Sequence, residues 1–416
     1  SLHTQLADEA ICIGPGPSAQ SYLNMEQIIS ATMVSGADAI HPGFGFLSEN
    51  ARFAELCEKC GITFVGPPSK VIRMLGNKKI ARSTMIAAGV PVVPGSEGDV
   101  EDIETGLKEA ERIGYPVIIK AALGGGGKGM RVANTPEEFP EAYATARKES
   151  EIAFGDGTMY IEHFVVNPRH IEFQILADSF GNVIHLGERD CSIQRNHQKM
   201  IEESPSAAVS SELREKMGHA AVTAAKAAGY VNAGTIEFLL EPDGKFWFME
   251  MNTRIQVEHP VTEWVTGIDL VKEQLKIASG MPLEISQEDV RIQGHAIECR
   301  INAENPQKNF RPSPGTIQGA HFPGGNGIRV DTCVYNGCKI PPYYDSMLAK
   351  LIVHAGNRKE AIAKMQSALG EVIIDGIDTN IDYQYEILKD EDYQSGNFDT
   401  GFLASHIIAG VKINEN

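Results

Sequence analysis

At 416 residues the chain is longer than one hydrophobic core normally supports, so we expect two or three domains. Its formal net charge of −18 argues against a nucleic-acid surface, and no apolar run of about 20 residues or amino-terminal signal pattern predicts association with a membrane or export. The seven cysteines are scattered and odd in number, which argues against a disulfide framework and favours a cytoplasmic enzyme.

The amino-terminal part of the chain alternates short apolar runs with helical patterns. The runs AICIG, ADAIHPG and ITFVGP are typical of buried strands, and the stretches between them have the apolar spacing of helices. Strands that alternate with helices predict a parallel sheet. We therefore expect an α/β domain here, with AICIG as its first strand.

A connection rich in proline, glycine and acidic residues, VPVVPGSEGDVED, leads into a small second unit. In this unit the apolar run YPVIIK is followed by the glycine-rich stretch KAALGGGGKGM and then by a returning strand, MRVAN. The stretch fails the Walker A pattern and does not open a helix, which argues against a P-loop and a dinucleotide-binding fold. It indicates a flap whose backbone can approach phosphate closely; an ordinary mobile hairpin is the alternative.

Further along the chain, apolar strands occur in pairs that are joined by turns. HIEFQILAD and GNVIHLGERD flank a turn at 179–181, and GTIEFLL and KFWFMEMN flank a turn at 241–244. Both pairs predict antiparallel hairpins. Helical periodicity returns in DLVKEQLKIASG, and a last α/β region begins at GHAIECRINAE. The fold class is therefore α/β, with α+β character in the middle of the chain.

Two acidic residues interrupt the apolar strands of the second hairpin. Glu237 and Glu250 come out nearly opposite each other, and Asn252 shares a face with Glu250 because side chains alternate along a strand. Unpaired carboxylates about 5 Å apart in an apolar setting repel each other unless a cation lies between them. These hard oxygen ligands suit Mg²⁺ better than zinc. The alternative is a solvent-facing strand in which the glutamates have no special role.

The stretch MNTRIQVEHPVTE, directly downstream, concentrates charged and amide side chains in a few residues. Such a density is costly in a core and typical of a functional site. Arg254 is suited to hold a small planar oxyanion through two hydrogen bonds, and Glu258, if it lies nearby, is suited to act as a general base. A charged surface loop is the alternative.

Together these motifs resemble the biotin carboxylases, a family of ATP-grasp enzymes. The resemblance covers essentially the whole chain and includes the blocks HPGFGFLSEN, NPRHIEFQ, ERDCSIQRNHQK, EMNTRIQVEHPVTE, GHAIECRINAE and PPYYDSM. It implies ATP-dependent carboxylation of biotin by bicarbonate, through a carboxyphosphate that releases CO₂ beside biotin. It also implies an amino-terminal α/β domain at 1–76, an ATP-grasp domain at 77–286 with a mobile lid over about 92–164, and a carboxyl-terminal domain at 287–416.

The resemblance also implies a role for each matched residue. The residues that it assigns to ATP are Lys78, Lys120, Gly126, Gly127, Glu162, His163, Val165, His170, Gln194 and His197. Those that it assigns to Mg²⁺ or Mn²⁺ are Glu237, Glu250 and Asn252, and those that it assigns to bicarbonate are Lys199, Arg254, Gln256 and Val257. Glu258 is implied as the base and Arg300 as the group that stabilises the biotin enolate, with Arg254 and Lys199 as further catalytic residues. On their own, Lys120 and His170 are equally consistent with a solvated lysine and a structural histidine.

The chain departs from the family pattern in several places. It lacks the family's opening strand and helix, so we expect the first βα unit of the amino-terminal domain to be missing. Phe44 stands where many members have Tyr, which removes a hydroxyl near biotin, and His163 stands where many have Lys. Because no Met-Lys-Met biotinylation sequence occurs, we expect biotin to be bound to a separate carrier protein.

The function that we favour is that of the biotin carboxylase subunit of a bacterial-type acetyl-CoA carboxylase, in fatty acid synthesis. Its partners would be the biotin carboxyl carrier protein and the carboxyltransferase subunits, and the resemblance suggests a homodimer. A fragment of pyruvate or propionyl-CoA carboxylase is an alternative. Another ATP-grasp ligase is disfavoured by the block from Arg254 to Glu258 and by Arg300. An inactive nucleotide-binding scaffold is disfavoured because a mere binder has no use for Glu258.

Overall fold

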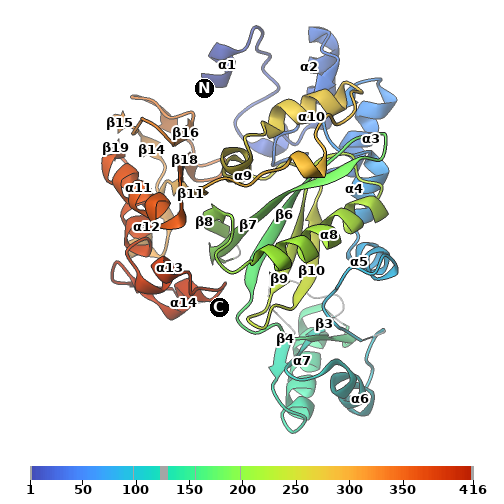
Figure 1. The fold of residues 1–416 in the computed structure, drawn as a ribbon. Coiled ribbons are helices and arrows are strands. Elements are labelled where there is room, and N and C mark those ends of the chain that lie inside the picture. Colours follow the sequence, from blue (N-terminus) through green and yellow to red (C-terminus); the bar gives the residue numbers. More distant parts are fainter. Residues whose placement is uncertain (1, 97, 122–129, 155, 197, 414–416) are drawn as a thin grey trace. The chain divides into compact units, whose positions relative to one another are not determined.

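The computed structural model describes residues 2–96, 98–121, 130–154, 156–196 and 198–413 (Figure 1). The chain forms two compact units. The first consists of Ser1–Val90, Arg169–Leu240 and Glu250–Asn416, and the second consists of Pro91–Pro168 and Glu241–Met249.

The amino-terminal part of the first unit combines helices with two short parallel strands. These strands are β1 (Ala39–Ile40) and β2 (Thr63–Phe64). The helices are α1 (Leu2–Leu6), the 3-10 helix η1 (Ser18–Gln20), α2 (Met25–Ser35), α3 (Ala51–Lys59), α4 (Ser69–Leu75) and α5 (Lys78–Ala87). Asn24, Asn50 and Asn77 begin α2, α3 and α5, since each side chain accepts a backbone N–H of the first turn. Phe53 and Cys57 on α3 belong to the local core.

One expected strand of this region is not formed. The run AICIG, at 10–14, has no strand assignment, so the prediction of a first strand there is wrong. Ile11 is 45% exposed. An apolar run becomes a strand only where a neighbouring strand pairs with its backbone, and no described strand does so here.

An eight-stranded sheet dominates the described part of the first unit, although the residues of its strand β10 before Glu250 belong to the second unit. Its strand order is β10-β9-β6-β7-β8-β11-β18-β16. The strands are β6 (Arg169–Ala177), β7 (Val183–Arg195), β8 (Gln198–Ser204), β9 (Asn232–Leu240), β10 (Phe246–Asn252), β11 (His295–Asn302), β16 (Ile328–Thr332) and β18 (Met347–Ala355). The two expected hairpins are confirmed, because β6 pairs with β7 and β9 neighbours β10.

Helices cover the faces of this sheet (Figure 1). α8 (Ser211–Ala227) packs on β6 and β7, and α10 (Leu270–Ala278) packs on β9. α9 (His259–Thr266) and α11 (Arg358–Glu371) both pack on β11 and β18. Side chains alternate between the two faces of these strands. Ala296 and Ile352 belong to the apolar cluster that includes Val261 and Val265 of α9 (the α9 cluster). Ile297 and Leu351 belong to the cluster that includes the buried residues of α11 (the α11 cluster). The residues at even positions up to Arg300 on β11 and from Lys350 onwards on β18 therefore face α9, whereas Leu348, beyond the register shift at Ile301, packs in another cluster.

The remaining elements of the first unit follow in the carboxyl-terminal part. They are the 3-10 helices η2 (Gln287–Asp289) and η3 (Pro306–Lys308), the helices α12 (Ile381–Ile387), α13 (Glu391–Ser395) and α14 (Phe402–Ser405), and the short antiparallel pairs β12–β13 (Glu304–Asn305, Arg311–Pro312), β14–β17 (Gly315–Thr316, Lys339–Ile340), β15–β19 (Gly319–His321, Ile373–Asp375) and β20–β21 (Ile407–Ile408, Val411–Lys412). Their apolar side chains extend the α11 cluster, with Phe402 and Leu403 of α14 buried in it. Among the described helices, none has both the length and the apolar character that a bilayer span requires.

The second unit is built on the strand order β4-β3-β5. The strands β3 (Val117–Ala121), β4 (Met130–Ala133) and β5 (Met159–His163) pack with the helices α6 (Ile103–Ile113) and α7 (Phe139–Phe154). β3 and β4 are antiparallel, with Lys120 opposite Met130, which confirms the expected strand and returning strand. The glycine-rich stretch between them lies outside the described residues.

Candidate active site

Lys199 is the centre of a buried cluster of charges in the first unit. Its ammonium group lies 2.6 Å from Oε2 of Glu172, 2.7 Å from Oε1 of Glu258 and 3.2 Å from Oε1 of Glu237. These carboxylates are almost entirely buried. Charged groups without water are stable only when opposite charges compensate them, so the lysine and the carboxylates stabilise one another.

The strand register assembles this cluster. Glu172 on β6 is opposite Glu237 on β9 and opposite Arg189 on β7. The Nε atom of Arg189 lies 2.5 Å from Oε1 of Glu172. Lys199 reaches the cluster from β8, where it pairs with Gln194 of β7. Adjacent strands thus place a row of charged side chains on one face of the sheet.

Glu258 lies between two cations at the start of α9. Its Oε1 accepts from Lys199, and its Oε2 lies 2.8 Å from Nη2 of Arg300 on β11. Burial alone would raise the pKa of Glu258, but the charges of Lys199, Arg300 and Arg189 hold it well below its ordinary value. The side chain is therefore a carboxylate at neutral pH, with a free electron pair for a proton.

The loop between β10 and α9 brings together the residues that the sequence singled out there. Arg254 donates from Nη1 to Gln256 at 2.7 Å and from Nη2 to Asn252 at 3.1 Å, and its Nε bonds Glu49 at 3.0 Å. Gln256 in turn donates to Glu237 at 3.2 Å. Arg254 and Glu258 thus belong to one hydrogen-bonded network, through Gln256, Glu237 and Lys199.

The expected metal ligands lie on the neighbouring strands β9 and β10. Asn252 donates to Oε1 of Glu237 at 2.7 Å. Partial loss of hydration and then the charge of Glu237 raise the pKa of Glu250. Glu237 is buried, but Glu250 is exposed, so the expectation of an apolar setting for both acids is wrong for Glu250. Its strand lies at an edge of the sheet, where water reaches the side chain. Carboxylate and amide oxygens are ligands that suit a hard divalent cation, but here Asn252 turns its amide nitrogen to Glu237 and its Oδ1 accepts from Arg254.

His170 joins the same group from β6. Its Nε2 lies 3.1 Å from Oε2 of Glu237, and His170, Glu172 and Glu237 each have a ligand atom within 4.8 Å of the others. Burial raises the pKa of Glu237, but Lys199 and His170 outweigh it and lower the pKa below its ordinary value. His170 is therefore part of the charged cluster in this structure.

The other residues assigned to ATP are divided between the units. Lys78 is the first residue of α5 in the first unit, and its charge partly opposes the rise in the pKa of Glu250. Within the second unit, Lys120 forms an ion pair with Glu162 at 2.5 Å, and His163 lies 3.6 Å from Glu241. Val165, in the same unit, is 9% exposed. Gly126, Gly127 and His197 lie outside the described residues.

Sequence reasoning missed several charged residues of this cluster. Glu172 and Arg189 are completely buried, and Glu49 binds both Arg254 and the backbone N–H of Thr253. Glu172 carried a usable signal, because it interrupts an apolar strand in the same way as Glu237. Glu49 carried none, since its partners are about two hundred residues away in the sequence.

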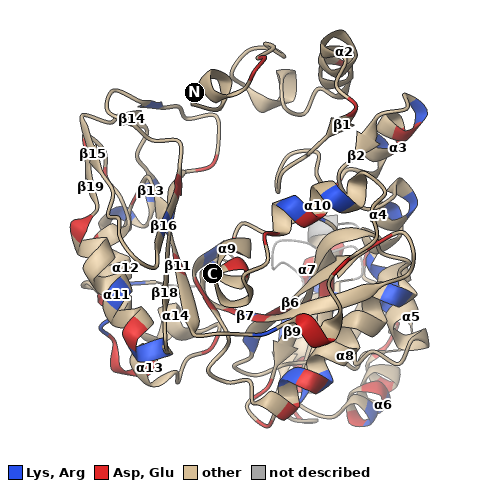
Figure 2. Cartoon of the chain, turned by 45° about the horizontal axis from the view of Figure 1, so that its top comes forward, with Lys and Arg blue, Asp and Glu red and all other residues tan. Residues whose placement is uncertain are grey.

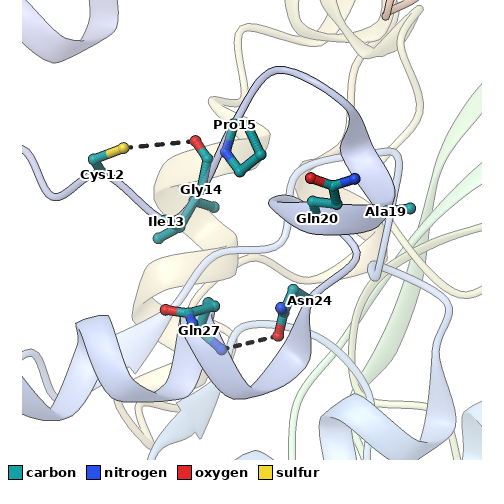
Figure 3. A pocket seen from close by; sticks show the side chains of 8 residues that line it. All are labelled: Cys12, Ile13, Gly14, Pro15, Ala19, Gln20, Asn24 and Gln27. Atoms are coloured by element: carbon teal, nitrogen blue, oxygen red, sulfur yellow. Dashed lines mark hydrogen bonds between the residues drawn. The ribbon is translucent and has the colours of Figure 1, made fainter.

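Two further features of the surface do not involve the charged cluster around Lys199: the charges on exposed helices, and a hollow in the amino-terminal segment. In Figure 2 acidic and basic residues are interleaved on exposed helices such as α6, where Lys108 pairs with Glu104. Figure 3 shows a hollow lined by eight residues of the amino-terminal segment, among them Cys12, Asn24 and Gln27. It contains none of the residues of the charged cluster.

Family models match the chain in three consecutive regions. The biotin carboxylase N-terminal domain matches residues 1–72, the ATP-binding domain of the carbamoyl-phosphate synthase L chain matches 77–286, and the biotin carboxylase C-terminal domain matches 298–405. Biotin carboxylase 1 of Bacillus subtilis is 57% identical over 411 residues, which cover 99% of this chain and 91% of that protein.

Solved structures give the same relationship. The biotin carboxylase domain dimer of Hydrogenobacter thermophilus 2-oxoglutarate carboxylase, in complex with MgADP, ADP and bicarbonate, is 51% identical, with a TM-score of 0.85 over 97% of this chain and 89% of that one. The biotin carboxylase subunit of a pyruvate carboxylase is 52% identical, with a TM-score of 0.89 over the same shares, 97% and 89%. The chain therefore belongs to the biotin carboxylase family, whose members are ATP-grasp ligases that carboxylate biotin in an ATP-dependent reaction.

Proposed function

We propose that this chain is the biotin carboxylase subunit of an acetyl-CoA carboxylase and carboxylates biotin on a separate carrier protein in the cytoplasm. The observation that carries the activity is the position of Glu258, a buried carboxylate that is kept ionised between Lys199 and Arg300. A fold that only binds a nucleotide gains nothing from a buried, ionised acid at this place, because burying it costs free energy. An enzyme that must remove a proton from bicarbonate requires such a group.

In the proposed reaction Glu258 accepts the proton of bicarbonate. Lys199, Arg254, Gln256 and the backbone of Val257 hold the anion, and the deprotonated oxygen attacks the γ-phosphorus of ATP. The bond from phosphorus to the leaving oxygen breaks, which gives ADP and carboxyphosphate. When Glu258 is protonated it no longer balances the charge of Arg300, whose Nη2 lies 2.8 Å away. Carboxyphosphate then divides into CO₂ and phosphate, the phosphate takes the ureido N–H proton of biotin, and the charge of Arg300 stabilises the resulting enolate, whose nitrogen attacks CO₂.

ATP and a divalent cation are the proposed cofactors. Glu237, Glu250 and Asn252 would hold Mg²⁺ or Mn²⁺, because they lie on the neighbouring strands β9 and β10 and Asn252 is hydrogen-bonded to Glu237. When it is bound, the cation neutralises phosphate charge. Lys78, His170 and Gln194 of the first unit would contact the nucleotide, with His197 as a further contact.

We further propose that the second unit is the lid of an ATP-grasp domain that extends over 77–286, between an amino-terminal domain at 1–76 and a carboxyl-terminal domain at 287–416. Its nucleotide contacts would be Lys120, Glu162, His163 and Val165, with Gly126 and Gly127 over the phosphates. The present ion pair between Lys120 and Glu162 is consistent with this role, since a phosphate can replace the carboxylate as the partner of the lysine.

The proposed partners are a biotin carboxyl carrier protein, which presents biotin as a bound substrate, and carboxyltransferase subunits. We also propose a homodimer, in line with the dimer named for the Hydrogenobacter thermophilus relative. Light scattering in solution tests the dimer directly, and a mass equal to one chain would contradict it.

The activity is tested by ATP hydrolysis with Mg²⁺, first without bicarbonate, then with it, and then with free biotin. We expect hydrolysis that depends on bicarbonate and rises with biotin. Glu258→Gln is the matched variant, because it keeps the shape of the side chain and removes the base. Nucleotide binding by both proteins without such hydrolysis in either would identify a scaffold instead.

A second candidate has support from the comparisons. The solved relatives include biotin carboxylase parts of pyruvate and 2-oxoglutarate carboxylases, so the chain could serve another carboxylase. Purified carrier domains separate the two. Faster carboxylation of a carrier from acetyl-CoA carboxylase than of one from pyruvate carboxylase supports the first assignment, and the reverse order supports the second.

A further inference from the structure

We propose that Lys350 is a positioning residue that fixes the peptide between Val257 and Glu258 and thereby sets the affinity for bicarbonate. This inference rests on the proposed function, in which these two residues bind and deprotonate the anion. Lys350 lies on β18, far from both residues in the sequence, and the motifs around the glycine flap and the acids do not include it.

The contact itself is direct. Nζ of Lys350 donates to the carbonyl oxygen of Val257 at 2.8 Å, and Lys350 is 6% exposed. That carbonyl belongs to the peptide group whose N–H is on Glu258. A peptide group is planar, so holding its oxygen also fixes the direction of its N–H and the course of the chain into Glu258.

The start of α9 needs such support, because its own side chains do not supply it. Glu258 is the N-cap residue, yet its carboxylate makes no capping bond to the helix and contacts Lys199 and Arg300 instead. His259 bonds the carbonyl of Gln256 at 2.8 Å. Burial, followed by the charge of Lys350, lowers the pKa of His259 to about 3, so this histidine is neutral at pH 7. It therefore provides no positive charge that could take the place of Lys350 at the carbonyl of Val257.

Lys350 is itself held in place by charged neighbours. In the sheet it is opposite Arg300 on β11 and opposite Asp331 on β16, and its ammonium lies 3.3 Å from Oδ2 of Asp331. Arg329 binds Asp331 through two bonds, of 2.8 and 2.9 Å, and reaches Glu263 of α9 at 2.6 Å. The helix is therefore tied to the sheet at its start and again at Glu263.

A purely structural role, as the counter-ion of a buried acid, explains the contact less well. Asp331 already has two bonds from Arg329. Glu298 of β11 lies on the same face, and burial raises its pKa well above the ordinary value against the opposing charge of Lys350. Among the described residues, however, neither of its carboxyl oxygens has a hydrogen-bond partner, so Lys350 is not bonded to this acid. Neither acid accounts for the hydrogen bond from Lys350 to the carbonyl oxygen of Val257, which positioning of this peptide group does explain.

The test uses the whole chain and three variants. Lys350→Met removes the ammonium group, Lys350→Gln keeps an N–H donor without the charge, and Lys364→Met is the matched control. Lys364 also donates to backbone carbonyls, those of His354 at 2.7 Å and Asn326 at 3.1 Å, but on α11 and away from the charged cluster. Two properties are measured: amide hydrogen exchange of the peptide that covers 254–262, and the KM values for bicarbonate and ATP in bicarbonate-dependent ATP hydrolysis.

For Lys350→Met we expect exchange in 254–262 to become about tenfold faster and KM for bicarbonate to rise roughly ten- to hundredfold, with KM for ATP within about twofold of the original chain. Lys350→Gln should bring the exchange rate and KM for bicarbonate most of the way back to the values of the original chain. Lys364→Met should match the original chain in both properties. Should Lys350→Met fail to fold, Asp331→Asn, which removes the carboxylate that steers Lys350, is expected to shift both properties in the same direction by a smaller factor.

The two proposals fail in different ways. Unchanged exchange together with an unchanged KM for bicarbonate in Lys350→Met would overturn the positioning role, whatever the enzyme does. KM values for bicarbonate and ATP that rise by the same factor would also overturn it, because they indicate general damage. If the original chain shows no bicarbonate-dependent hydrolysis, the proposed function is wrong, and the exchange measurement alone then decides whether Lys350 holds the loop.

Discussion

The carboxyl group of Glu202 on β8 offers a direct test of the electrostatics beside Glu258. Glu202 is opposite Glu298 on β11, and both residues are completely buried. Nε of Arg300 lies 2.6 Å from Oε1 of Glu202, but without the geometry of a hydrogen bond, and among the described residues nothing donates a hydrogen bond to either carboxyl group. Burial raises the pKa of Glu202 from 4.5 to about 7, against the opposing charge of Arg300.

The sign and size of the effect follow from this shift. A folded-state pKa above the unfolded value means that the folded protein binds the proton more tightly. The stabilisation is therefore complete below pH 4.5 and is lost as the pH rises through about 7. Each pKa unit corresponds to about 1.4 kcal/mol, so Glu202 makes the fold lose about 3 kcal/mol over this window.

The assay compares urea unfolding of the original chain and of Glu202→Gln at pH 5, 6, 7 and 8. The neutral amide cannot titrate, so the free energy of unfolding of the original chain should fall relative to the variant by about 2.5 kcal/mol from pH 5 to pH 8. Glu55→Gln is the control. Hydrogen bonds from Lys59 and Arg73 lower the pKa of Glu55, so it stays ionised throughout and its variant should differ by a constant amount. Parallel curves for the original chain and Glu202→Gln would refute the reasoning, because they would mean that Arg300 fully compensates the burial of this carboxylate.

Three further predictions concern catalysis. Glu258→Gln should lower bicarbonate-dependent turnover by roughly 10²- to 10⁴-fold and leave nucleotide binding unchanged in calorimetry; an equal turnover would remove Glu258 as the base. Arg254→Lys should raise KM for bicarbonate by about tenfold, because an ammonium group cannot reproduce the planar pair of donors, and a KM equal to that of the original chain would argue against direct contact with the anion. Removal of divalent metal with EDTA should abolish ATP hydrolysis, and addition of Mg²⁺ or Mn²⁺ should restore it. The variant Glu237→Gln should need a higher metal concentration for half-maximal recovery. An unchanged metal requirement in this variant would argue against Glu237 as a ligand.

Much of the site was predictable because local patterns carry it. Glu237 interrupts an apolar strand, and the residues from Arg254 to Glu258 are dense in charge within a few positions, so ordinary alternation and composition single them out. The hairpins that carry them were predictable for the same reason, since turn residues and period-two patterns depend only on neighbours in the chain. The strand expected at 10–14 failed, because a strand exists only with a partner.

By itself, the sequence determined which side chains are candidates for the proposed chemistry, because the residue types and their local spacing are written in it. Only the tertiary structure decided which distant residues complete the cluster. Glu172 lies opposite Glu237 through the pairing of β6 with β9, and it meets Lys199 of β8 because only β7 lies between β6 and β8. Lys350 reaches Val257 from β18. Exposure was decided at the same level, since Glu250 lies on an edge strand while Glu237 lies one strand further in. Strand order and register bring together residues that are far apart in the chain, and no local pattern specifies them.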